Sequence, residues 1–287
     1  MRPGVPLLLV VAASACAHPY NYTGPGPRYA SAPAPVHYAR AIDGADSVRV
    51  VTFNIQYAIH VDRAIALIRT TPELAGADIV TLQEMDEPGT RAIAESLGMH
   101  YVYYPATLHP HTHRDFGDAI LSPWPLVDDR KVILPHLGRF EHTQRIAVGA
   151  TVLARGTRLR VYSVHLGTQV ETPPQAKRDQ VAAVMADAAQ YPLVIIAGDM
   201  NSHGIGDQFT AHGYRWITQH DPATVHWFNW DHVFLSGFPT TDSARTGVIH
   251  DNWGASDHRP VWAVILLPSR GGHPDSRTSP SLGTPGP

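Results

Sequence analysis

Residues that commonly bind metal ions or phosphate groups stand at the ends of several short apolar runs. The clearest case is LVIIAGDMNS (193–202), in which an apolar run leads into Gly198, Asp199 and Asn201. A buried strand cannot leave such polar groups unsatisfied, so they either form a turn or are held at a strand end for chemistry. Comparable positions at other runs are Asn54, Glu84, His165, Asp231, Asp257 and His258.

If these positions meet at one edge of the predicted sheets, they form a cleft of carboxylates, imidazoles and amides. Hard oxygen ligands with few histidines favour Mg²⁺ or Mn²⁺ over Zn²⁺. Such a set fits hydrolysis of a phosphate ester: the cation neutralises the phosphate, a carboxylate positions the attacking water, and an imidazolium offsets charge in the transition state. Because neighbours on a strand point to opposite faces, the carboxylate that orients His258 can be one other than Asp257.

Each position also has an ordinary interpretation. GDMN is a typical turn sequence, Glu84 a typical surface acid and His165 a typical core histidine. Asp257 and His258, shortly before Pro260, could belong to a loop. Only the joint occurrence of these residues favours an active site.

The elements that must position these residues are short strands interleaved with helices. Helical patterns cover residues 61–71, 88–98 and 173–190, and Arg155–Thr157 forms a short turn between two strands. Antiparallel pairs inside an alternating pattern predict mixed sheets covered by helices. The strand-like runs are 48–55, 77–84, 100–105, 118–122, 131–135, 146–154, 158–166, 191–199, 230–237 and 259–267.

Seven short motifs then occur in a fixed order between residues 52 and 261: TFNI, LQE, GDAILS, SVHL, GDMNS, WDHVF and SDHRPV. Together they resemble the endonuclease/exonuclease/phosphatase superfamily, which includes pancreatic-type deoxyribonucleases, abasic-site endonucleases, inositol-polyphosphate 5-phosphatases and neutral sphingomyelinases. The resemblance implies an α/β fold: a four-layer αββα sandwich with two mixed, largely antiparallel β-sheets flanked by helices. It places the active site at one edge.

The resemblance also implies the metal ligands. Glu84 is expected to be the principal ligand of Mg²⁺ (or Mn²⁺), with Asn54 beside the metal and the phosphate. Asp257 is expected to be a second ligand or a partner of His258.

The catalytic residues implied in the same way lie in the later motifs. Asp199 and Asn201 orient the attacking water and hold the phosphate, and His258 stabilises the transition state. His165 is the second histidine on the phosphate side, and Asp231 is the acid that supports a catalytic histidine.

Some positions depart from the pattern or leave it open. Asp118 stands where the family commonly has Asn, and an added carboxylate could repel a phosphate or bind metal. Arg145 is either a substrate-binding residue or a plain surface arginine. The loop with His109, His111 and His113 could grip an anion or a second metal, but alternating histidines without fixed geometry favour a solvated loop.

Composition indicates an ordinary globular protein. The chain has 287 residues, a net charge of −3 and a pI near 6.6, so it lacks the overall basic field of strong nonspecific nucleic-acid binders. Lys131 and Lys177 are its only lysines, and the single cysteine, Cys16, excludes a disulfide within the chain.

The first 17 residues have the layout of an export signal, and the small residues before Cys16 resemble a bacterial lipoprotein signal. An ordinary secretory signal is the alternative. Residues 18–46 are expected to form a tether without regular structure, residues 47–267 the domain, and residues 268–287 a disordered tail.

The sequence therefore predicts an exported, Mg²⁺- or Mn²⁺-dependent phosphodiesterase or phosphomonoesterase, monomeric and acting on a nucleic acid, a phospholipid headgroup or an inositol phosphate. Lipidation of Cys16 would anchor it to a membrane facing the periplasm or the cell exterior; otherwise it is secreted. The alternative is a non-catalytic surface binding protein on the same fold.

Overall fold

The structure, a computed structural model, describes residues 19–31, 47–110, 112–239 and 244–268. The predicted signal with Cys16, residues 32–46 of the predicted tether and all but the first residue of the predicted tail lie outside these ranges. No helix in the described ranges is long and apolar enough to cross a membrane.

The described strands form two sheets. The first has the order β1-β5-β6-β4-β3-β14-β13, with β2 also paired to β5, and the second has the order β11-β12-β10-β9-β8-β7. The strands of the first sheet are β1 (Tyr20–Asn21), β2 (Tyr29–Ser31), β3 (Ser47–Asn54), β4 (Ile79–Met85), β5 (His100–Leu108), β6 (Asp115–Ser122), β13 (Arg245–Val248) and β14 (Val261–Leu266). Those of the second are β7 (Leu126–Ile133), β8 (Ile146–Ala154), β9 (Thr157–His165), β10 (Val194–Asp199), β11 (Arg215–Trp216) and β12 (Asp231–Ser236).

Both sheets are mixed and largely antiparallel, as predicted. The β3–β4 and β9–β10 pairs are parallel, whereas the remaining neighbours in the two strand orders pair antiparallel. The predicted turn between β8 and β9 is confirmed: Arg155 and Gly156 have φ of 52° and 78°, and such a turn matches the twist of a hairpin.

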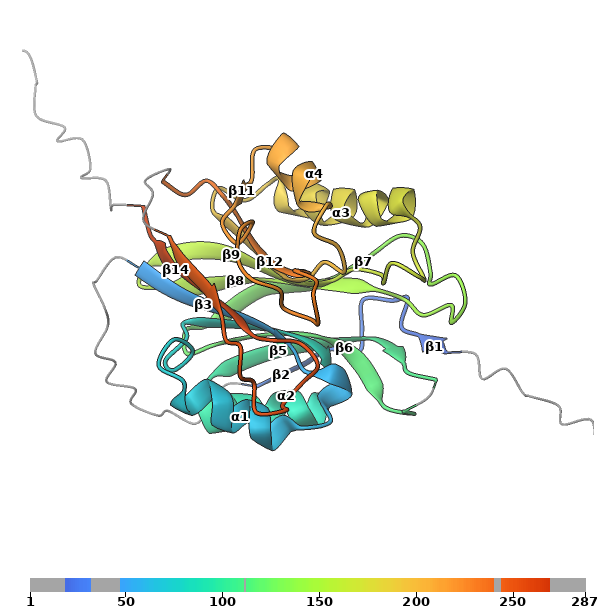
Figure 1. The fold of residues 1–287 in the computed structure, drawn as a ribbon, viewed down its shortest axis with the longest axis horizontal. Coiled ribbons are helices and arrows are strands. Elements are labelled where there is room, and N and C mark those ends of the chain that lie inside the picture. The colour runs from blue at the N-terminus through green and yellow to red at the C-terminus, as the bar shows by residue number, and fades with distance from the viewer. Residues whose placement is uncertain (1–18, 32–46, 111, 240–243, 269–287) are drawn as a thin grey trace, which may run out of the picture.

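Helices cover the outer face of each sheet. In Figure 1, α1 (Val61–Thr70) and α2 (Glu87–Leu97) lie below one sheet, and α3 (Pro174–Ala188) and α4 (Gly206–Ala211) lie above the other. One apolar cluster fills the space between the sheets and includes Val50, Ile120 and Ile195. Two further clusters separate each sheet from its helices. The predicted four-layer αββα sandwich is therefore confirmed.

The three predicted helices form close to their predicted limits. Helix α2 begins after Asp86, whose carboxylate accepts a hydrogen bond from Gly89 N, and it ends at Gly98, which has φ of 63°. The sequence interpretation missed α4, β11 and β13, and it placed the start of β7 five residues late. These elements are short, or they lack the apolar alternation that signals a strand.

The prediction of an unstructured tether over 18–46 is wrong for residues 19–31. Tyr20 and Asn21 pair with Leu108 and Thr107 of β5, and β2 pairs with the same strand. The Asn21 amide donates to His142 O and accepts from Gln144 N. These strands are too short to show a pattern of their own, and they form because β5 offers unpaired backbone groups.

Strand direction brings the predicted site residues to one edge of the sandwich. We call this the site edge: β3, β4, β5, β9 and β10 end there, and β6, β8, β12 and β14 begin there. Leu266, at the end of β14, pairs with Ser47 at the start of β3 and thus lies at the opposite edge.

Candidate active site

Three of the predicted residues form one row across the second sheet. Asp199 at the end of β10 is in register with His165 at the end of β9 and with Asp231 at the start of β12. Residues in register on neighbouring strands point to the same face. All three side chains are buried, and His165 Nε2 lies 3.4 Å from Asp199 Oδ2.

The backbone around Asp199 requires the residues found there. Gly198 has φ of 149°, and a Cβ at this position would lie 2.0 Å from Val164 O. Asn201 has φ of 48°, and its backbone N–H donates to Asp199 Oδ1 at 2.7 Å. GDMN thus forms a turn that holds the Asp199 carboxylate at the strand end, and its role in chemistry stays a prediction.

The first sheet contributes Asn54 and Glu84. The Asn54 amide donates to Glu84 Oε1 and to Asp199 Oδ2, both at 3.1 Å, and so joins the two sheets. Glu84 lies at a bulge between Leu82 and Met85 and has φ of 59°. Its Oε2 accepts from Tyr57 N at 3.1 Å, in a segment where residues 56–58 all have positive φ. Such strain in non-glycine residues is typical of functional sites.

His258 pairs with Asp231, and not with its sequence neighbour Asp257. Asp231 Oδ2 lies 2.8 Å from His258 Nδ1, and His258 Nε2 lies 3.7 Å from Asp199 Oδ2. The prediction that another carboxylate orients His258 is confirmed. Asp257 is exposed, accepts from Ser256 Oγ at 3.3 Å, and lies near enough to raise the pKa of Glu84 by its charge.

The charges of the cluster shift its pKa values in opposite directions. Burial, with the charges of Asp231 and Glu84 adding to it, raises the pKa of Asp199 to about 7. Burial lowers the pKa of His258, but the charges of Asp231 and Asp199 outweigh this effect and raise it to about 10. Burial and the nearby Arg145 hold the pKa of His165 well below its usual value. At neutral pH, His258 is thus a cation and His165 is neutral.

Arg145 belongs to the site. Its Nη1 lies 2.9 Å from Nε2 and 3.0 Å from Nδ1 of His165, and its guanidinium faces the ring of Phe116. The interpretation as a plain surface arginine is therefore wrong.

Asp118 is buried beside the cluster. Burial and the negative charges of Glu84 and Asp199 raise its pKa well above the usual value, while Arg145 partly offsets them. The raised pKa favours the neutral carboxyl, and a neutral carboxyl would not repel a phosphate. A protonated Asp has nearly the shape of Asn and keeps one donor.

The histidine-rich loop is not uniformly solvated, which corrects the sequence interpretation. His109 is buried, and its ring packs against Tyr57 and Phe116 with centroid distances of 4.8 and 5.4 Å. His113 is exposed, and His111 lies outside the described residues.

Lys177 is the most informative residue that sequence reasoning missed. It is buried on α3, and its Nζ donates to Asn201 O at 2.8 Å. Burial lowers the pKa of this ammonium group to about 8. One of only two lysines in the chain, placed on a helix shortly before the GDMN strand, was the available signal.

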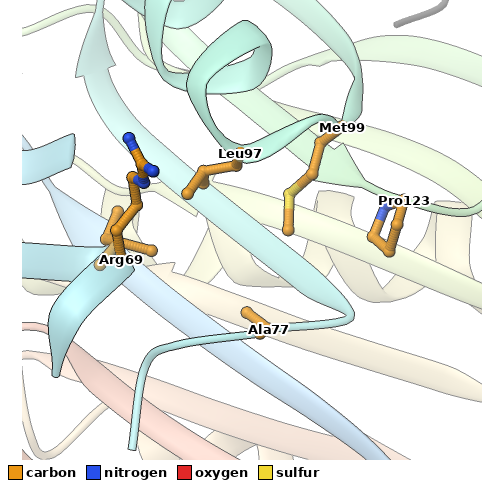
Figure 2. Close-up of a pocket in the computed structure, with 7 residues that line it drawn as sticks. Arg69, Ala77, Leu97, Met99 and Pro123 are labelled. Atoms are coloured by element: carbon orange, nitrogen blue, oxygen red, sulfur yellow. The ribbon is translucent and has the colours of Figure 1, made fainter. Parts of the chain in front are cut away.

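One hollow of the described chain lies away from these residues. Figure 2 shows Arg69, Ala77, Leu97, Met99 and Pro123 around it, near the ends of α1 and α2. None of the predicted site residues lines it, and Ala77 precedes β4 while Pro123 follows β6, at the edge opposite the site.

Comparison with known families gives an independent result. Residues 51–258 match the model of the endonuclease/exonuclease/phosphatase family. The chain belongs to this family. Members of the family are phosphoesterases, which agrees with the class of chemistry indicated by the site. The comparison with curated proteins found no match.

Solved structures support the family fold. A protein of this family from Leptotrichia buccalis is 14% identical with a TM-score of 0.63 and covers 77% of this chain and 100% of its own. Sphingomyelinase C from Streptomyces griseocarneus is 18% identical with a TM-score of 0.59 and covers 76% and 99%. TDP2 from D. rerio, in complex with a single-stranded DNA product, is 14% identical with a TM-score of 0.61 and covers 77% and 99%.

The residues of the cluster fit a divalent cation, on which family members in general depend. Asp199, Asp231 and His258 offer ligand atoms that all lie within 4.8 Å of one another. However, a protonated His258 that is paired with Asp231 is a poor ligand. Glu84, whose side chain is 15% exposed and whose burial raises its pKa, has the oxygen atoms and the access that a hard cation needs.

Proposed function

We propose that this chain is a metal-dependent hydrolase of phosphate esters. The observation that carries this proposal is the contact of His258 with two buried acids, Asp231 on one side at 2.8 Å and Asp199 on the other at 3.7 Å. The pKa of Asp199 is raised to about 7 and that of His258 to about 10. Between these values, Asp199 is ionised and can act as a base while His258 is a cation.

Asp199, His258 and Asp231 have different roles in the proposed reaction. Asp199 orients a water molecule and accepts its proton while the water oxygen forms a bond to phosphorus. The bond from phosphorus to the ester oxygen then breaks, and the leaving alcohol takes up a proton from the solvent. Protonated His258, which Asp231 holds in position, offsets the negative charge that develops on the phosphoryl oxygens.

Amide and arginine groups hold the phosphate in this scheme. Asn54 is fixed by its hydrogen bonds to Glu84 and Asp199. The Asn201 amide donates to Leu166 O and Asp199 Oδ2, and its backbone O accepts from Lys177. Arg145 contacts His165 and presents a planar, permanently charged donor group that suits phosphoryl oxygens.

The divalent cation would be held by Glu84, with Asn54 and Asp257 beside it. When bound, Mg²⁺ or Mn²⁺ neutralises phosphate charge and polarises the phosphoryl oxygen. A cluster with Glu84, Asp199, Asp231 and Asp257 needs such a positive charge, since each carboxylate raises the cost of ionising the others.

A soluble aryl phosphodiester, assayed after chelation and return of Mg²⁺ or Mn²⁺, tests the proposal. We expect metal-dependent hydrolysis that falls by about 10³-fold or more in Asp199→Asn and in His258→Gln. The chain offers a matched control: His136 and Asp179 form a pair at 2.8 Å between half-exposed side chains. His136→Gln and Asp179→Asn should retain activity.

A non-catalytic binding protein on this fold remains the alternative function. Equal and slow hydrolysis by the wild type and by Asp199→Asn would favour it. A panel of DNA, phospholipid and inositol phosphate then distinguishes substrates, since similar structures include a sphingomyelinase and a protein bound to a DNA product.

Export and lipid attachment belong to the proposal as well. The signal-like layout before Cys16 supports transfer out of a bacterial cytoplasm and a diacylglycerol on Cys16. Mass spectrometry of the membrane fraction would detect this adduct. A mature chain without it would favour an ordinary secretory signal. Analytical ultracentrifugation tests the expected monomer.

A further inference from the structure

Exposed apolar side chains collect at the site edge. Trp227 is 88% exposed, Val170 75% and Phe140 60%, and Ile59, Phe228 and Trp253 are about half exposed. Each lies in a loop that leaves or enters a strand at this edge: 55–60 after β3, 134–145 before β8, 166–173 after β9, 217–230 before β12 and 249–260 before β14. We call these six residues the apolar rim.

In the described residues, exposed large apolar side chains concentrate at the site edge. Of its ten exposed large apolar side chains, only Leu266 lies at the opposite edge, and the others, including Tyr20 on β1, lie at the site edge. Single exposed apolar residues need no explanation, but their collection around one site indicates an interaction surface.

The charges of the same loops favour a lipid bilayer over a nucleic acid as the partner. These loops hold three arginines and five acids, and neither lysine of the chain lies in them. Binding to a nucleic-acid backbone relies on several basic contacts with phosphates. Tryptophan and phenylalanine without a basic stripe are instead suited to the interface of a zwitterionic bilayer.

The position of strand β1 also supports docking of the site edge on a bilayer. Strand β1 pairs with the end of β5, at the site edge, and lies at the right-hand end of the molecule in Figure 1. Cys16 is only four residues before Tyr20, so an extended chain between them spans at most about 14 Å. A lipid on Cys16 would therefore hold the site edge, and not the opposite edge, next to the bilayer.

We propose that the apolar rim docks on a phospholipid bilayer and presents the active site to headgroup phosphodiesters, which are its substrate. The inference rests on the proposed function for the choice of substrate, and on exposure and topology for the docking. Rim side chains enter the interface, and the active site at the same edge faces the phosphates of the headgroups.

The test uses the full chain with Cys16→Ser, so that no lipid anchor contributes, and vesicles of phosphatidylcholine. We expect the chain to sediment with the vesicles and to hydrolyse their lipid. Trp227→Ser combined with Trp253→Ser should weaken partition by about 100-fold and reduce lipid hydrolysis in proportion. Hydrolysis of the soluble aryl phosphodiester should stay the same. Phe at both positions should restore partition in large part, and Leu266→Ser at the opposite edge should have no effect.

The outcomes separate the inference from the proposed function. Absence of vesicle binding, or binding that the double Ser variant does not weaken, overturns the docking. A loss of single-stranded oligonucleotide cleavage in that variant, with vesicle binding unchanged, assigns the rim to base stacking and also overturns it. If the wild type does not cleave the soluble diester, the proposed function fails, while sedimentation still tests the docking.

Discussion

Replacing Asp231 by Asn is the sharpest test of the charge arrangement. The rise in the pKa of His258 from 6.5 to about 10 corresponds to roughly 5 kcal/mol in favour of the protonated ring, at about 1.4 kcal/mol for each pH unit. Asp231, at 2.8 Å, contributes more to this rise than Asp199 does. Asn keeps the shape of the side chain but removes the charge, so the pKa of His258 should fall from about 10 to about 8 or below.

The assay is the pH dependence of kcat/KM for the soluble diester between pH 6 and 11. In the wild type, the rate should rise as Asp199 ionises near pH 7 and fall as His258 loses its proton near pH 10. In Asp231→Asn, the alkaline fall should move down by about two pH units, and this shift alone should lower the rate at pH 9 by about tenfold.

The same variant has a stability signature. Since the folded-state pKa of His258 is raised, its stabilising contribution is present below pH 6.5 and is lost as pH rises through about 10. Asp231→Asn should thus be less stable than the wild type at pH 6 by a few kcal/mol, with the difference shrinking above pH 10. Asp179→Asn, at the exposed pair, should change neither profile. An unchanged alkaline limb in a folded Asp231→Asn variant would refute the assignment of His258 as the cation.

Three further predictions concern single positions. Glu84→Gln should raise the Mg²⁺ concentration required for half-maximal activity by about tenfold or more, measured by metal titration after chelation, because one anionic ligand is lost. Asp118→Asn should keep kcat/KM at pH 7 within about threefold, since burial favours the neutral form of the native carboxyl; a large loss would show that its charge matters. Lys177→Met should lower kcat by about tenfold and lower the free energy of unfolding in urea by about 1–3 kcal/mol, because Asn201 O loses its buried donor; an unchanged kcat would contradict its positioning role.

Much of the fold follows from local patterns in the sequence. In runs 146–154 and 158–166, the residues that favour strands and the turn between them lie close together in the sequence. Gly98 ends its helix through its own backbone conformation, and this does not depend on how the helix packs. The ends of these runs already held the residues of the site. Their convergence was predictable because parallel strands end, and antiparallel strands begin, at the same edge.

Other features depend on partners that are distant in sequence. Tyr20 and Asn21 form a strand only because β5 has an open side, and nothing in the surrounding Pro- and Gly-rich segment signals it. The raised pKa of Asp118 is caused by burial and by charges from other strands. Lys177 resembles any helix lysine until α3 is packed over the GDMN turn.

The position of the last strand has a consequence for biosynthesis. Strand β14 lies between β3 and β13 in the first sheet, and His258 lies three residues before it. A nascent chain that has not yet delivered these residues leaves one side of β3 unpaired and lacks its imidazolium. Hydrolytic competence therefore requires that β14 has been synthesised and has paired with β3.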